Sequence, residues 1–317
     1  MPDFSPMNAA ELMDKVLDVY KKSFWMQIAF AAIIMVVGFV AIFVVVFVLT
    51  FALIFGLGIG VVADAGEWYY IAMILGMGLL LLPLFLLWQA FSSSGHILLS
   101  RQAFYGHKVR LGHMGLTRVL LRVATSLLAQ IILMIPFILV SVAVLYALFI
   151  IASEFLLVHE WQFLVFTFFV IFLLSFLYLV YSHVFSLAIP VAVLEQKHFF
   201  ATITRSFQLI RPDFWRVFGI RAIWFLVVFA FSSTAQGVFM ILNMGIEWLA
   251  NTAGMGWMAL MMITGSLSWL ITIAVSLLSA PLEHIMMALL YFNQRMKNEG
   301  LDLEIKLEKL SIGQGGI

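Results

Sequence analysis

The sequence contains no cysteine and few charged residues. The absence of cysteine excludes disulfide bonds, thiolate metal ligands and cysteine nucleophiles. Charged residues make up only 10% of the 317 residues, against roughly 25% in an ordinary soluble domain. The 17 Lys and Arg nearly balance the 16 Asp and Glu, so there is no basic excess of the kind that binds nucleic acids. These shortages exclude a soluble globular domain, a disordered chain and an electrostatic nucleic-acid binder.

Hydrophobic residues make up 64% of the chain and gather in six long runs that carry no formal charge. A hydrocarbon core of about 30 Å is crossed by roughly 20 helical residues, and the shortest run has 25 residues. The sequence therefore predicts an all-α fold, a polytopic integral membrane bundle of six transmembrane helices. The runs cover residues 23–63, 68–100, 123–153, 161–194, 222–246 and 248–282.

The first run is longer than one simple span requires, because a single helix of this length would extend roughly 60 Å. We expect Gly56, Gly58 and Gly60 to end or bend this helix near the outer surface. Two short helices inside the run are the alternative, and they would reverse the sidedness of everything downstream.

The distribution of basic residues favours a single crossing. All 17 Lys and Arg lie before the first run, between the second and third, between the fourth and fifth, or after the sixth. The other three connections carry only Asp and Glu as formal charges. Because Lys and Arg gather on the cytoplasmic side of a membrane, both termini are predicted to be cytoplasmic and the spans to form three hairpins.

This topology divides the chain into three parts. A cytoplasmic amphipathic helix, a six-span transmembrane domain with two inner loops and a cytoplasmic tail follow one another. Their predicted bounds are residues 1–23, residues 24–294 with inner loops at 101–122 and 195–221, and residues 295–317.

Two cytoplasmic segments have helical amphipathic patterns. Asn8 and Glu11 form a capping-box pattern at the start of the first segment, and Ser23 suits an N-cap at the start of the first span. The second segment, residues 199–210, places large aromatics on one face and charges elsewhere. We expect the aromatic face with Phe207 to be buried in the membrane interface or under the bundle, and the polar face with Arg205 to stay open to a partner. The candidate lipid or partner surface consists of Arg205, Phe207, Arg211 and Arg216.

Short internal matches indicate repeated hairpins. Residues 21–25 (KKSFW) match residues 211–215 (RPDFW), and the pattern GHI at residues 95–97 matches EHI at residues 283–285. We interpret them as three parallel repeats, each an inner amphipathic helix followed by a transmembrane hairpin. In the tail, by contrast, residues 301–308 alternate apolar and charged side chains. That period of two predicts an extended strand.

Ionisable groups within the apolar runs are the first candidates for a functional site. His183 lies 12 residues before Glu195, which would place it near mid-membrane on one continuous helix. Two interpretations stay open, a proton or substrate site in the bundle and polar contacts that join helices. The candidate intramembrane site consists of His183, Tyr178, Ser182, Glu283 and His284.

No pattern of residues indicates catalysis or a cofactor. Ser94 and His96 lie close in sequence but point to different helix faces, and no third member completes a triad. The sequence has no Walker A loop, no HExxH motif and no metal-spaced set of His and Asp. We therefore predict no enzyme activity, no cofactor and no metal.

Three segments resemble the motifs of a bacterial six-span membrane family. They are AELMDKVLDVYKKSFW (residues 10–25), LEQKHFFATITRSFQLIRPDFWR (residues 194–216) and PLEHIMMALLYFNQRMKNEGLDLEI (residues 281–305). This family is the membrane domain found beside some glycerophosphodiester phosphodiesterases, and more often alone as an uncharacterised protein. The resemblance implies a six-span protein of the bacterial cytoplasmic membrane.

The resemblance implies no catalytic activity. A phosphodiesterase barrel needs about 250 residues, and only about two dozen residues follow the last apolar run. Asn293 also stands where such proteins often carry Asp.

These patterns lead to two main functional hypotheses. The first is a non-enzymatic membrane module that binds membrane lipids, or a cytoplasmic or membrane protein partner, from the cytoplasmic side. The alternative is the membrane subunit of a transporter, whose inner helices dock on an ATPase. An intramembrane enzyme is a third class, without a motif to support it.

Overall fold

The computed structural model describes residues 5–57, 67–111, 116–155, 160–252, 256–301 and 303, and among them it contains helices and no strand. Six helices are long and apolar enough to cross a membrane. The protein is therefore an all-α polytopic membrane bundle, as predicted. The long helices are α1 (Ala9–Leu57), α3 (Glu67–Phe104), α4 (Leu116–Phe155), α5 (Glu160–His183), α8 (Phe214–Thr252) and α9 (Trp257–Glu299). The short ones are α6 (Ala188–Leu194), α7 (Phe200–Ile210) and the 3₁₀ helix η2 (Arg211–Asp213).

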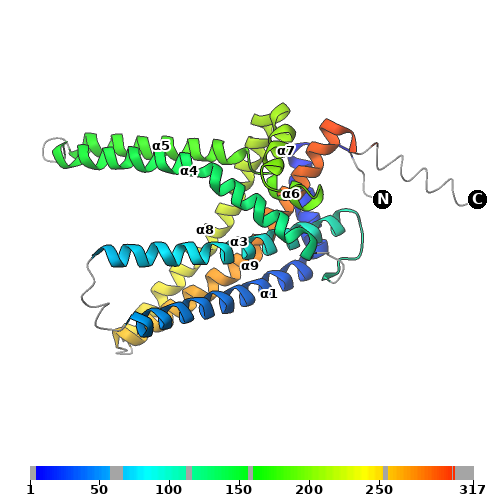
Figure 1. The fold of residues 1–317 in the computed structure, drawn as a ribbon. Helices are drawn as coiled ribbons and strands as arrows, with labels where there is room; N and C mark the ends of the chain where they lie inside the picture. Colours follow the sequence, from blue (N-terminus) through cyan, green and yellow to red (C-terminus); the bar gives the residue numbers. More distant parts are fainter. Residues whose placement is uncertain are drawn as a thin grey trace, which may run out of the picture.

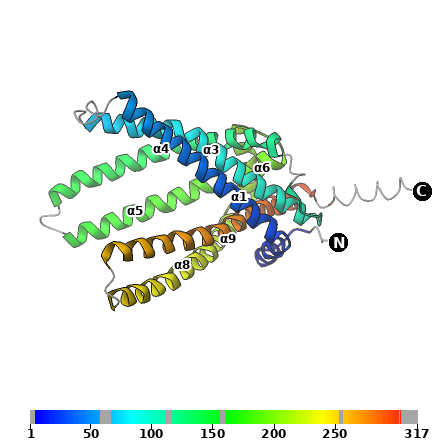
Figure 2. The same cartoon turned by 90° about the horizontal axis from the view of Figure 1, so that it is seen from below.

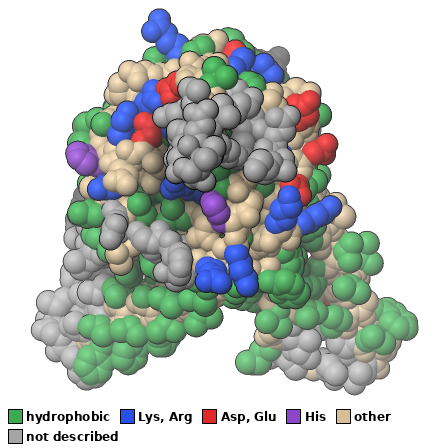
Figure 3. All heavy atoms as spheres, turned by 90° about the vertical axis from the view of Figure 1, so that its right-hand side faces the viewer, with side chains coloured by type: hydrophobic (Ala, Val, Ile, Leu, Met, Phe, Trp, Pro, Cys, Tyr) green, Lys and Arg blue, Asp and Glu red, His purple; other side chains and the backbone are tan. Residues whose placement is uncertain are grey.

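The long helices form three hairpins, α1–α3, α4–α5 and α8–α9, which meet at one end of the molecule. Figures 1 and 2 show the hairpins diverging from that end, where both termini and α6 and α7 also lie. Figure 3 looks onto the same end and shows Lys, Arg, Asp, Glu and His side chains gathered on it, while hydrophobic side chains cover the hairpins below. We call it the charged end.

The hydrophobic core lies near the charged end. Its largest cluster joins α1, α7, α8 and α9 through completely or almost completely buried side chains, including Leu12, Leu209, Val217 and Tyr291. Away from this core the helices expose large apolar side chains to their surroundings. A bilayer accepts such a surface, because helices satisfy their own backbone hydrogen bonds.

Helix α1 is one uninterrupted helix that runs through the predicted boundary at residue 23. Asn8 and Glu11 form the predicted capping box, with reciprocal hydrogen bonds of 2.9 Å. The Ser23 hydroxyl does not cap a new helix but donates to the Val19 carbonyl at 2.7 Å. Such bonds to the preceding turn often bend a helix, and Figures 1 and 2 show the first turns of α1 lying across the charged end.

Glycine does not divide the first run where the structure describes it. Helix α1 continues through Gly56 to Leu57, whereas Gly58 and Gly60 lie outside the described residues. The alternative of two short helices is therefore not found in α1. The proline residues inside α3, α4 and α9 also leave those helices continuous.

The inner loops contain helix, and α7 confirms the amphipathic helix predicted at residues 199–210. The loop at 101–122 is helical at both ends, and the loop at 195–221 contains α7, η2 and the start of α8. Helix α9 continues to Glu299 and ends at Gly300, whose φ of +66° is a left-handed C-cap that favours glycine.

The predicted strand in the tail is wrong where the structure describes it. Leu301 and Leu303 are helical, and the Leu303 amide donates to the Gly300 carbonyl at 2.9 Å. Residue 302 and residues 304–308 lie outside the described residues. The alternation of apolar and charged residues is therefore no guide to the backbone at the start of this segment.

Matched positions of the first and third hairpins meet in space. The rings of His96 and His284 stack with centroids 5.4 Å apart, and those of Phe104 and Phe292 stack at 4.9 Å. Each pair joins α3 to α9 at the same sequence offset. Equivalent residues beside a rotation axis make such contacts, which supports the interpretation of these two hairpins as repeats.

Candidate functional site

Helices α6 and α7 are folded into the charged end beside the last residues of α5. Between His183 and α6 the chain makes tight turns, and hydroxyl groups then fix α7 to its neighbours. The Ser206 hydroxyl donates a hydrogen bond to the Val184 carbonyl at 2.8 Å and accepts one from the Leu187 amide at 3.2 Å. The hydroxyls of Thr202 and Ser126 lie 2.7 Å apart. These buried hydrogen bonds set the face of α7 that turns inward.

The link between α6 and α7 contains two residues with unusual backbone geometry. Gln196 and Phe199 have φ values of +60° and +51°, which L-residues seldom adopt. Such conformations cost roughly 1–3 kcal/mol each and persist only where the surroundings hold them. The structure therefore needs strong contacts on both sides of this link.

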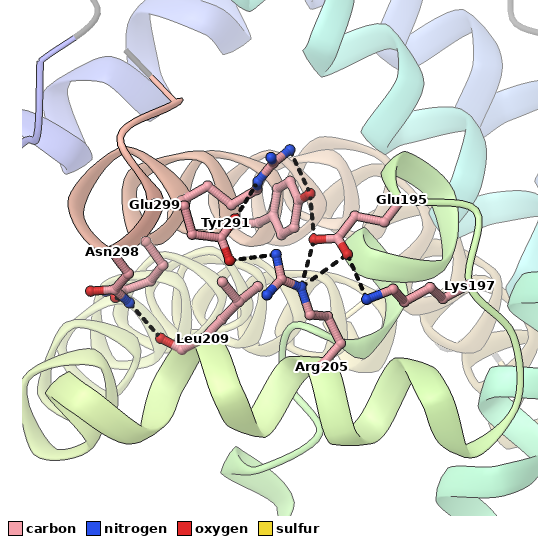
Figure 4. Close-up of polar contacts among 9 residues, drawn as sticks. Glu195, Lys197, Arg205, Leu209, Tyr291, Asn298 and Glu299 are labelled. Carbon is pink, nitrogen blue, oxygen red and sulfur yellow. Dashed lines mark hydrogen bonds and ion pairs between the residues drawn. The ribbon is translucent and has the colours of Figure 1, made fainter. Parts of the chain in front are cut away.

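Arg205 supplies these contacts at the centre of an ion-pair network (Figure 4). Its Nε donates to both carboxylate oxygens of Glu195 at 3.0 Å, and its Nη2 lies 2.5 Å from Glu299 Oε1. The Tyr291 hydroxyl donates to Glu195 at 3.0 Å, and Lys197 pairs with the same carboxylate at 3.2 Å. We call these five residues the Arg205 network; it joins the α6–α7 link to the end of α9.

The same network tunes the charge of Glu195. Burial raises the pKa of this carboxyl, but hydrogen bonds from Arg205, Lys197 and Tyr291 outweigh it and hold the pKa below its usual value. A carboxyl with a lowered folded-state pKa stabilises the fold above its unfolded pKa, and this contribution is lost as the pH falls through the folded value. Acid therefore weakens the attachment of α7 to α9.

The prediction that Arg205 stays open to a partner is wrong. Phe207 is 41% exposed, whereas the Arg205 side chain is only 19% exposed and lies within its network. The inward face carries smaller side chains whose hydroxyls find buried partners, and the charge of Arg205 is neutralised by two carboxylates. The buried residues of α7 are Thr202, Ile203, Ser206, Leu209 and Ile210.

The outward face of α7 and the start of α8 combine aromatic and basic side chains. Phe200, Phe207 and Arg211 recur at helical spacing on one face, and each is exposed, as are Trp215 and Arg216. We call these five residues the α7 surface. It keeps Phe207, Arg211 and Arg216 of the predicted surface and excludes Arg205.

The candidate intramembrane site does not assemble around His183. Helix α5 ends at His183, so the 12 residues before Glu195 are not one helix and the mid-membrane estimate fails. His183 is buried, but Tyr178 is 46% exposed and packs on Phe137. The Ser182 hydroxyl donates to the Leu179 carbonyl at 3.0 Å. The partner of His183 is instead Arg221, whose Nη1 lies 3.2 Å from His183 Nδ1.

Glu283 and His284 also have separate environments. Glu283 is exposed, whereas His284 stacks on His96. Nδ1 of His96 lies 2.5 Å from Oε1 of Gln27. Because an amide oxygen only accepts, Nδ1 carries the proton in that contact. The Gln27 amide then donates to the Ser100 hydroxyl at 3.2 Å.

These contacts form a buried polar junction between α1, α3 and α9. Gln27 is not among the residues predicted from the sequence. The repeat match that aligns His96 with His284 is the sequence signal for this junction. Ser94 donates to the Ala90 carbonyl rather than to His96, so these two residues form no nucleophile and base pair. Among the described residues, no group of three His, Asp or Glu is placed to hold a metal ion.

Comparison of the chain with protein-family models, with curated proteins and with solved structures finds no match. The resemblance to the six-span bacterial family therefore stays a prediction. The function has to be argued from the charged end itself.

Proposed function

We propose that the protein is a non-catalytic membrane module that binds lipid headgroups through the α7 surface. The observation that carries this proposal is the two-sided construction of α7. One face is fixed to α9 by the Arg205 network, and the opposite face leaves Phe200 and Phe207 exposed beside Arg211. A fold that only needed to bury α7 would not require exposed aromatics there.

The proposal includes a sidedness and a location. In it, the charged end faces the cytoplasm of a bacterium, and the six spans lie in its cytoplasmic membrane. The positive-inside distribution of all 17 Lys and Arg supports the first point. The resemblance to the bacterial six-span family supports the second.

Lipid is the ligand favoured by the chemistry of the α7 surface. Aromatic rings such as Trp215 prefer the interface between headgroups and hydrocarbon. Basic residues near an anionic leaflet contribute about 1 kcal/mol each. Helix α7 itself lies at the charged end, from which the hairpins diverge (Figure 1). A protein partner that docks on the α7 surface is the competing ligand.

Photo-crosslinking from position 207 tests this function. With benzoylphenylalanine in place of Phe207, irradiation of intact membranes is expected to give lipid adducts. The double variant Arg211→Glu and Arg216→Glu should lower the yield of anionic-lipid adducts at least severalfold, because two cations near an anionic leaflet contribute about 2 kcal/mol.

The exposed position Asp14 on α1 provides the control, since a crosslinker there leaves α7 and its buried contacts unchanged. Adducts within the chain alone from both positions would contradict a binding role. A single protein adduct from position 207 would favour a partner, and an ATPase in that adduct would favour the transporter alternative.

A further inference from the structure

Arg221 of α8 is a cation without a matching anion. Its Nη1 donates to Nδ1 of His183 at 3.2 Å, and no carboxylate of the described residues lies within 4 Å of its guanidinium. Glu283 acts on it only at longer range. An unpaired charge in a low-dielectric environment is costly, so this position calls for a counter-ion.

His183 orients Arg221 without neutralising it. A guanidinium can only donate, so Nδ1 of His183 accepts and its proton sits on Nε2. That Nε2 is buried and has no hydrogen-bond partner among the described residues. The rings of Phe214 and Phe218 enclose the imidazole edge-on, with centroids 5.0 and 5.4 Å away. The pair therefore presents one fixed positive charge.

Two apolar stripes lead to this charge from different hairpins. On α5, Phe172, Phe176 and Leu179 share a face with His183, at spacings of four, three and four residues. On α8, Phe225 and Phe229 follow Arg221 at the same kind of spacing. All five side chains are 43–62% exposed.

Figures 1 and 2 show α5 and α8 close together near the charged end and diverging away from it. Arg221 lies two turns into α8, roughly 10 Å from its start. Exposed Trp215 in the first turn of α8 suits the headgroup interface. A guanidinium at this depth lies close enough to the interface for a lipid phosphate to reach it while the contact with His183 is kept.

We propose that an anionic phospholipid binds between α5 and α8, with its phosphate on Arg221 and its acyl chains along the two stripes. This inference rests on the proposed lipid-binding function and adds a defined site to it. A net charge of −1, as on phosphatidylglycerol, balances the guanidinium. A zwitterionic lipid brings an ammonium group with its phosphate and leaves the excess positive charge in place.

Lipid titration of the purified full chain tests the site. After delipidation in detergent, phosphatidylglycerol, phosphatidylethanolamine or inorganic phosphate is added, and bound lipid is counted by native mass spectrometry while the melting temperature is followed. We expect phosphatidylglycerol to be retained and to raise the melting temperature. Phosphatidylethanolamine should bind more weakly, and inorganic phosphate should raise the melting temperature only a little.

The variant Arg221→Gln should bind phosphatidylglycerol about tenfold or more weakly, because a charge-assisted hydrogen bond is lost. Lys21→Gln is the matched control: it makes the same charge change at an exposed position on α1, and its binding should equal that of the unmodified protein. Undiminished binding by Arg221→Gln, or equal protection by inorganic phosphate, overturns the proposal.

A second pair of variants keeps the test decisive if Arg221→Gln does not fold. The double variant Phe225→Ala and Phe229→Ala should lower phosphatidylglycerol retention severalfold, whereas Phe39→Ala with Phe43→Ala should not. Both pairs are stacked and exposed on single helices. Equal retention by the two double variants overturns the site at α5 and α8. Crosslinking from position 207 is independent of these variants. A negative result for the site between α5 and α8 is therefore distinguishable from a negative result for lipid binding by the α7 surface.

Discussion

Arg205→Ala is expected to lower the free energy of unfolding by about 2–3 kcal/mol, because it leaves two carboxylates without their shared partner. Glu195 and Glu299 lie 3.0 and 2.5 Å from the guanidinium, and none of the three side chains is more than 27% exposed. Without Arg205 the strained link between α6 and α7 also loses its main attachment to α9. Thermal and denaturant unfolding in one detergent measure this change.

Arg211→Ala is the matched control, because it removes the same side chain from an exposed position at the end of α7. Its effect should stay within about 0.5 kcal/mol. The variant Glu195→Gln adds a pH test. The unmodified protein should lose stability below the usual carboxyl value of 4.5, and the variant should lose less over that range. Equal free energies of unfolding for Arg205→Ala and Arg211→Ala would mean that the Arg205 network contributes nothing to stability.

Gly95→Ala is expected to destabilise the protein by about 1–3 kcal/mol through overpacking. A Cβ added at Gly95 would overlap the ring of Phe30. The Phe30 ring is almost completely buried, stacked on Phe91 and edge-on to His96. Since these neighbours leave the ring little room to withdraw, α1 and α3 must separate. The melting temperature in detergent reports the loss.

Gly219→Ala serves as the comparison, since a Cβ at this helical position meets no atom within 4 Å. It should stabilise the protein by up to about 1 kcal/mol, the difference in helix propensity. Equal melting temperatures for the two variants would refute the close approach of α1 and α3.

The contrast between Gly95 and its repeat partner shows how matched positions have diverged. The third hairpin carries Glu283 at the equivalent position, and that side chain is exposed. The first hairpin requires glycine because Phe30 fills the space above it. The neighbouring positions carry His96 and His284, whose rings stack on each other.

Much of the fold could be predicted from composition and charge. Uncharged runs longer than a bilayer requires predicted the six long apolar helices, and the capping box of Asn8 and Glu11 is a local pattern that forms as expected. The role of Ser23 was misread because its hydroxyl suits an N-cap as well as a bond to the preceding turn. Local sequence does not choose between these two partners.

The candidate site was harder to predict because its contacts join distant parts of the chain. Arg205 meets Glu299 through folding of α7 against α9, and nothing near Arg205 in sequence indicates that carboxylate. Large aromatics such as Phe207 also suit both a buried face and a membrane interface, so hydrophobicity alone did not reveal that Arg205 turns inward. Arg221 was not singled out because it lies at the end of a basic segment.

The proposed function is tested most directly by finding on which side of the membrane the charged end lies. The proposal places this end, and the lipid contacts made there, on the cytoplasmic side. The chain has no cysteine, so single cysteines can be introduced at Lys108, exposed at the charged end, and at Ala65, between α1 and α3 in sequence. An impermeant maleimide added to intact cells should label the cysteine at 65, and the cysteine at 108 only after the membrane is opened. Labelling of both positions from the same side, or of position 108 alone in intact cells, would contradict a cytoplasmic charged end.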